Sequence, residues 1–128
     1  MDKFNLLLCV AARVMLALIF LLSGFNKIVA LGAMQGYMAS VGVPGVLIYP
    51  TIVLELGAGL AVAVGYQTRA AALLLAGFSL LTAFIFHNQL GDQMQFIMFM
   101  KNVAMAGGLL LLVRFGAGEG SLDRRLAR

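Results

Sequence analysis

Four long apolar segments constrain this chain more than any other feature of its sequence. They cover approximately residues 5–28, 46–65, 70–87 and 96–115. Each is close to the ~20 mostly apolar residues that an α-helix needs to cross a bilayer. The 128-residue chain is 62% hydrophobic and 11% charged, whereas soluble domains are about 45–50% apolar and about 25% charged. We therefore predict a single transmembrane domain, residues 1–128, with four helices.

The composition of these segments favours helices over strands. Strands of a membrane barrel read as alternating segments of about 10 residues. Here, runs such as LLLAGFSLLTAFIFH are continuous and rich in Leu and Ala, which favour helix. The first segment is longer than a signal-peptide core and has no clear small-x-small cleavage site, so we interpret it as a permanent helix. The predicted fold class is all-α, an integral membrane four-helix bundle.

The distribution of Lys and Arg predicts how the bundle is oriented. Lys3 precedes the first helix, Arg69 lies between the second and third, and the C-terminal tail GSLDRRLAR carries three arginines. Because basic residues gather on the cytoplasmic side of membrane proteins, we predict that both termini are cytoplasmic. The first connection then lies outside. The i, i+3, i+4 spacing of Met34, Tyr37 and Met38 predicts a short amphipathic helix there, at the outer interface.

Six ionisable or strongly polar residues lie within or beside the apolar segments. They are Arg13, Lys27, Glu55, His87, Lys101 and Asn102. Insertion scales put a charge at the centre of a membrane helix at about 2.5–3.5 kcal/mol, so such residues tend to face the bundle interior and find partners. A rise of about 1.5 Å per residue places Arg13 and Glu55 near the midplane and Lys101 nearer the outer surface. We therefore predict that Glu55 pairs with Arg13, with Lys101 as the second choice.

These six residues have two interpretations. They form either a structural cluster that fixes helix packing or an outward-opening pocket that binds a ligand or handles protons. No metal site is predicted, because His87 has no second His and no Cys near it, and Cys9 is the only cysteine. The net charge of +4 comes without a contiguous basic patch, so we expect contact with lipid headgroups and not with nucleic acid.

The ordered set of motifs resembles the DoxX family of small four-helix bacterial membrane proteins, in particular its YqjF-like inner-membrane branch. The matching stretches are ARVMLALIFLLSGFNKI, YMASVGVPG, LELGAGLAVAVGYQTRAAAL, LLTAFIFHN, FMKNVAMAGGLLLL and GEGSLDR, which span nearly the whole chain. The residues that carry the family pattern are Arg13, Gly24, Lys27, Glu55, Gly65, Arg69, His87, Lys101, Asn102 and Asp123. The resemblance implies a multi-pass protein of the bacterial cytoplasmic membrane. It also implies a link to quinone-linked sulfur oxidation or to membrane redox and oxidative-stress complexes, with which relatives are associated.

These observations together favour a quinone- or small-molecule-binding subunit of a redox or stress-response system. In that role Glu55 and His87 handle protons, and Lys101 or Arg13 holds a quinone oxygen. No flavin, haem or iron–sulfur motif is evident, so quinone is the one cofactor considered and electron transfer needs a partner protein. Membrane lipids and further copies of the chain are also compatible partners. The alternatives are a non-enzymatic membrane scaffold and a small-solute transporter, and we assign no catalytic residue.

Overall fold

Seven helical segments make up the part of the chain that the structure describes. The computed structural model describes residues 2–127 and has no strand in that range. The order is α1 (Lys3–Val29), α2 (Leu31–Ser40), the 3-10 helix η1 (Gly45–Leu47), α3 (Ile48–Val64), α4 (Thr68–Phe86), α5 (Gln93–Phe115) and α6 (Leu122–Leu126). Four helices, namely α1, η1 continued by α3, α4 and α5, are long and apolar enough to cross a membrane. The predicted all-α class with four spanning helices is confirmed.

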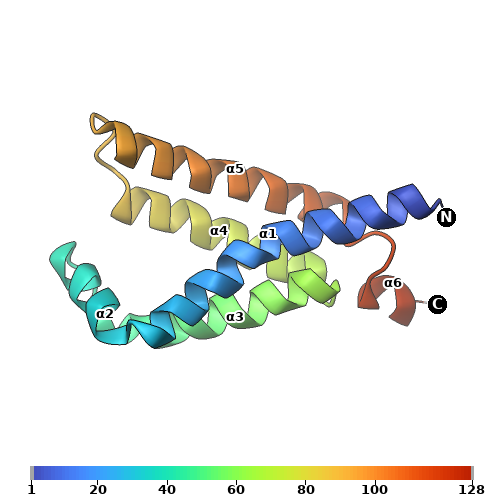
Figure 1. The fold of residues 1–128 in the computed structure, drawn as a ribbon, viewed down its shortest axis with the longest axis horizontal. Helices are drawn as coiled ribbons and strands as arrows, with labels where there is room; N and C mark the ends of the chain where they lie inside the picture. The colour runs from blue at the N-terminus through green and yellow to red at the C-terminus, as the bar shows by residue number, and fades with distance from the viewer. Residues whose placement is uncertain (1, 128) are drawn as a thin grey trace.

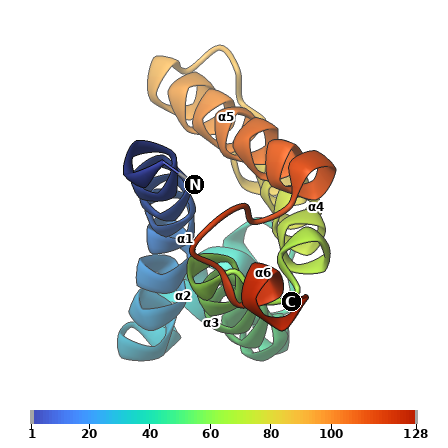
Figure 2. The ribbon, with the colours of Figure 1, turned by 90° about the vertical axis from the view of Figure 1, so that its right-hand side faces the viewer.

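Two helix pairs build the bundle. α1 packs chiefly against α3, and α4 chiefly against α5, while a smaller contact between α3 and α4 joins the pairs. Figure 2 shows the two pairs beside each other, seen from the end that carries both termini. The buried core consists of Ala17, Phe20, Val62, Ala71, Ala72, Leu75, Ala76, Ala106 and Leu109. Its many alanines lie largely on α4, and small side chains let membrane helices approach closely.

Two glycines fix how α1 and α3 are aligned. A side-chain carbon added at Gly24 would lie 2.8 Å from Leu56 Cγ and 3.3 Å from Glu55 Cβ. A carbon added at Gly59 would lie 3.2 Å from Leu21 Cδ2. The two helices run in opposite directions (Figure 1). Residues nearer the start of α1 therefore lie opposite residues nearer the end of α3. This alignment of the two helices decides which of their polar residues can come into contact.

The ends of the bundle differ in kind. Both termini lie at one end, while α2 and the α4–α5 connection lie at the other (Figure 1). The short helix predicted in the first connection is confirmed as α2. It ends before a turn at Gly42, whose φ of 83° is a left-handed value that favours glycine. That both termini share one side agrees with the predicted orientation, and which side is cytoplasmic stays a prediction.

The outer faces of the bundle are apolar. Leu7, Met15, Val53, Leu73 and Phe84 are each more than half exposed. Exposed apolar area on this scale marks a contact surface with other apolar material. With four spanning helices, that material is the lipid hydrocarbon.

Candidate functional site

A cavity of about 570 Å³ lies between the helices at the end that carries α2. Its volume is in the ~300–1,000 Å³ range of small-molecule sites. Five of the six predicted residues line it: Lys27, Glu55, His87, Lys101 and Asn102. The rest of the lining is mostly apolar, with Leu, Ile, Phe and Met side chains from α1, α4 and α5. The structure therefore brings these five residues together around one cavity, and their role in ligand binding or proton handling stays a prediction.

The helix α2 covers one side of this cavity. Met34, Tyr37 and Met38 all line it, and the Tyr37 ring lies 5.4 Å from the Phe86 ring, centroid to centroid. The i, i+3, i+4 face that the sequence predicts at the membrane interface therefore contacts the cavity. Methionine side chains are flexible and fill irregular apolar spaces, so this cover can adapt to the shape of an occupant.

Glu55 is held by an ion pair with Lys27. The Lys27 Nζ atom lies 2.7 Å from Glu55 Oε1, and the Glu55 side chain is 3% exposed. The contact lacks hydrogen-bond geometry, so Oε1 has a charge partner but accepts no hydrogen bond from the described residues. Nζ donates instead to Ser23 Oγ, one turn earlier on α1, at 2.8 Å. The prediction of a basic partner for Glu55 is confirmed.

The sequence-based prediction named the wrong partner for Glu55, with Arg13 as the first choice and Lys101 as the second. The register of α1 on α3 explains the difference. Gly24 faces Glu55, so the basic residue one turn beyond Gly24, Lys27, lies at the level of the carboxylate. Arg13 lies opposite Gly65, at the far end of α3. Depth counted along each helix separately does not include this relative shift.

Arg13 belongs to a different structure, at the end of the bundle that carries the termini. Its side chain is buried, and Nη2 donates to the Gly120 carbonyl at 2.7 Å while Nε donates to the Cys9 carbonyl at 3.3 Å. Gly120 lies in residues 116–126, which we call the C-terminal latch. Arg13 does not line the cavity, so it is removed from the set of candidate ligand-binding residues.

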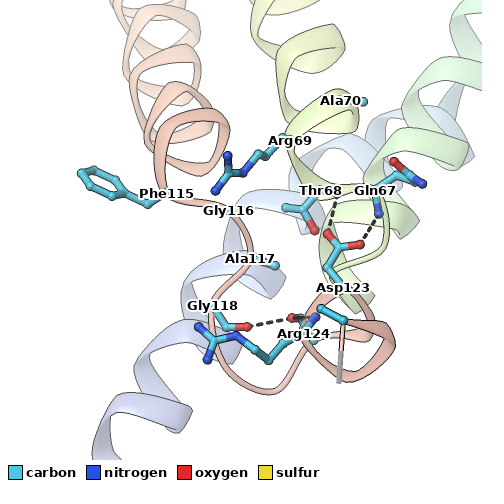
Figure 3. A pocket seen from close by; sticks show the side chains of 12 residues that line it. Gln67, Thr68, Arg69, Ala70, Phe115, Gly116, Ala117, Gly118, Asp123 and Arg124 are labelled. Atoms are coloured by element: carbon cyan, nitrogen blue, oxygen red, sulfur yellow. Dashed lines mark hydrogen bonds between the residues drawn. The ribbon is translucent and has the colours of Figure 1, made fainter.

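Asp123 fastens the same latch to α4. Its carboxylate accepts hydrogen bonds from the backbone N–H groups of Gln67, at 2.7 Å, and Thr68, at 2.9 Å (Figure 3). These N–H groups begin α4 and have no partner within their own helix. The Asp123 N–H donates to the Gly65 carbonyl at 2.8 Å. The latch therefore ties the N-terminal half of α1 to the end of α3 and the start of α4, beside a smaller pocket of about 380 Å³.

Because of these contacts of Asp123, the stability of the fold depends on pH in the acid range. Burial alone would raise the pKa of Asp123, but the hydrogen bonds from Thr68 and Gln67 and the charge of Arg13 outweigh it. The pKa therefore lies below its ordinary value of 3.8. A carboxyl with a lowered folded-state pKa stabilises the fold above its unfolded-state pKa, and that contribution is lost as the pH falls through the folded-state value.

We expect the wild-type chain to lose thermal stability as the pH falls below about 4. In Asp123→Asn the stability at neutral pH is lower and this part of the pH dependence is absent. Asp123 is half-buried, so water screens the effect and the change is modest. Thermal unfolding of the detergent-solubilised protein, followed by circular dichroism across the acid range, measures both. Superimposable pH curves for the two proteins would show that Asp123 has no such role.

The remaining cavity residues have different surroundings. His87 Nδ1 lies 2.9 Å from Gln95 Oε1. An amide oxygen only accepts, so Nδ1 is the donor in this contact and Nε2 takes no part in it. The Asn102 Nδ2 group donates to the Ser79 carbonyl and to Thr82 Oγ1, each at 3.1 Å. That amide therefore joins α5 to α4.

Lys101 is the exception among the charged residues of the cavity. It is exposed and lines the cavity. No described residue forms an ion pair or a hydrogen bond with its ammonium group. Its charge is therefore available to whatever occupies the cavity.

Some polar members of the site do not stand out in the sequence. These are Ser23, Ser79, Thr82 and Gln95. Serine and threonine in a membrane helix commonly bond their own backbone, as Thr82 does with the Phe78 carbonyl, and so carry little signal. The i, i+3 spacing of Ser79 and Thr82, on a helix that faces Asn102, is the pattern that could reveal them.

Four spanning helices around a cavity with polar walls define a small polytopic membrane protein with an intramembrane pocket. The sequence profile of the DoxX family matches residues 8–88, and the chain belongs to this family. The match includes Arg13, Lys27, Glu55 and His87, while Lys101 and Asn102 lie beyond it.

Two relatives cover nearly the whole chain. Inner membrane protein YqjF of Escherichia coli K12 is 42% identical over 126 residues, which is 98% of this chain and 97% of the relative. Inner membrane protein YphA of the same organism is 38% identical over 125 residues, 92% of this chain and 89% of the relative. No solved structure matches the chain. With its four membrane-spanning helices, the chain is a multi-pass inner membrane protein of the DoxX family.

Proposed function

We propose that the cavity binds a small lipid-soluble molecule with an oxygen-bearing head, such as a quinone. The chain would then act as a membrane subunit of a redox or oxidative-stress system. One observation carries the proposal: charged and polar groups of four helices meet in the wall of a mostly apolar cavity of about 570 Å³. Apolar pockets with a few convergent polar groups are the usual form of small-molecule sites.

Each polar residue has a role that follows from its surroundings. The ammonium group of Lys101 is unpaired among the described residues, so it is the group that can donate to a ligand oxygen. His87 keeps Nε2 for proton exchange because Nδ1 is bonded to Gln95. Glu55 is the second proton-handling candidate, and it is paired with Lys27. Electrons would come from a partner protein, because these side chains carry none.

The test measures quinone that is bound to the purified protein. Quinone is extracted with solvent and quantified by its absorbance change on reduction. The matched variants are Met98→Trp, which fills the cavity, and Met94→Trp, one turn away on α5 and outside the lining. We expect saturable binding to the wild type and to Met94→Trp. In Met98→Trp we expect binding that is weaker by about tenfold or more, equivalent to about 1.4 kcal/mol.

Equal binding by the two variants, or no saturable binding by the wild type, would contradict the proposal for quinones. The alternative function, a non-enzymatic membrane scaffold, is then favoured by a specific observation. The Lys27–Glu55 pair joins α1 to α3, and the Asn102 amide joins α5 to α4, so both contacts also brace helices. A scaffold predicts loss of stability in variants of these residues without any saturable ligand.

A further inference from the structure

The charges in the cavity wall do not cancel. Lys27 and Glu55 neutralise each other at 2.7 Å. The other lining residue that carries a formal charge, in the described part of the chain, is Lys101. The cavity therefore carries one uncompensated positive charge, and it lies on α5.

Lys101 lies well inside the membrane-spanning length of its helix. It is eight residues from Gln93, the start of α5, which is about 12 Å along the axis. An unpaired charge at such depth is costly, and in known membrane proteins it finds a partner or a water-filled cavity. The helix also places apolar residues next to it, since Met98 and Met105 line the same cavity one turn on either side. A cation with apolar neighbours is suited to a ligand that is apolar in its body and negative at its head.

We infer that the cavity selects a monoanionic amphiphile, whose apolar body fills the space between the helices and whose negative oxygen contacts Lys101. This inference rests on the proposed binding of a lipid-soluble molecule. It narrows the ligand class from oxygen-bearing heads in general to ionised ones. The same chemistry is found in a free long-chain carboxylate and in the headgroup of an anionic phospholipid.

A matched pair of probes tests the charge alone. Dodecanoate and dodecanol have the same chain and differ in the charge of the head. Binding of each radiolabelled probe is measured by equilibrium dialysis on the whole protein in phosphatidylcholine nanodiscs at mildly alkaline pH, with protein-free nanodiscs subtracted. The variants are Lys101→Gln, Lys101→Arg, which keeps the charge, and Arg114→Gln. The last removes the same charge from the opposite end of α5, outside the cavity.

We expect the wild type to bind dodecanoate about tenfold more tightly than dodecanol, equivalent to about 1.4 kcal/mol. That preference should disappear in Lys101→Gln and remain in Lys101→Arg and Arg114→Gln. A second arm replaces part of the phosphatidylcholine with phosphatidylglycerol. Competition with dodecanoate would identify the lipid headgroup as the source of the anion, and its absence would identify the free carboxylate.

Equal affinity for the acid and the alcohol, or a preference that survives Lys101→Gln, would overturn the inference. Binding of neither probe would overturn it too. The proposed function fails separately, through the quinone measurement on the Met98→Trp and Met94→Trp pair. A chain that binds quinone without preferring the acid therefore keeps its proposed function and loses this inference.

Discussion

Replacing Lys27 by methionine is expected to lower the free energy of unfolding by about 3 kcal/mol. Removing one partner of a buried ion pair typically costs about 3–5 kcal/mol, because the other charge stays buried without compensation. The lower end applies here, since unfolded helices in a membrane environment also find polar partners. Glu55 is the residue left behind, and its side chain is 3% exposed.

Removing the other partner of the ion pair, Glu55, should lower the free energy of unfolding by less. In Glu55→Gln the residue left behind is Lys27, whose side chain is 20% exposed. Lys27 also lies two residues from the end of α1, so its long side chain can reach the interface. We therefore expect Lys27→Met to be the more destabilising of the two. The double variant should be less damaging than the sum of the singles, since it leaves no unpaired charge.

Reversible unfolding in mixed micelles, followed by circular dichroism, measures all three variants. Arg13→Met combined with Glu55→Gln is the matched control, because Arg13 bonds Gly120 and not Glu55. That pair should be additive. Coupling between Arg13 and Glu55, or strict additivity between Lys27 and Glu55, would contradict the ion pair described here.

The fold class is predictable from the sequence because the bilayer sets it. Each of the four apolar segments is long enough to span the bilayer. In lipid, backbone N–H and C=O groups must be hydrogen-bonded within the protein, and helices of this length meet that requirement. The ends of the helices are less well predicted. The fourth segment was expected to begin at residue 96, but α5 begins at Gln93, because the Asp92 side chain accepts from the Met94 N–H at 3.1 Å and starts the helix earlier.

The site is only partly predictable, for a different physical reason. The cost of burying a charge singles out individual residues in the sequence, and five of those residues line one cavity in the structure: Lys27, Glu55, His87, Lys101 and Asn102. It does not give the relative shift of two packed helices. That shift follows from small close contacts such as Gly24 on Leu56, and it sends Arg13 to the opposite end. The latch is also hidden, since nothing local to Asp123 indicates that it caps α4, over fifty positions earlier in the chain.

Gly65 is where the latch tolerates least change, and Gly65→Ala is expected to destabilise the protein by about 3 kcal/mol. Its φ of 75° is a left-handed value, where a non-glycine residue costs about 1–3 kcal/mol. An added Cβ would also collide with Arg13 Nη1 and Ser121 Cβ, and it would lie 3.0 Å from the Ser121 Cα. The backbone atom cannot move away without shifting the latch, so the contacts of Arg13 with Gly120 and of Asp123 with α4 are lost together.

Gly57→Ala on the same helix is the control, and it should change stability in the opposite direction. A Cβ at Gly57 meets nothing within 4 Å, and alanine is favoured over glycine in a helix interior by about 1 kcal/mol. Thermal unfolding of both variants in detergent gives the comparison. Because the latch and the cavity lie at opposite ends of the bundle, Gly65→Ala that still folds at low temperature should keep the ligand affinity of the wild type. Similar stabilities for the two variants would show that the latch does not hold this end closed, and weakened ligand binding in Gly65→Ala would show that the two ends are coupled.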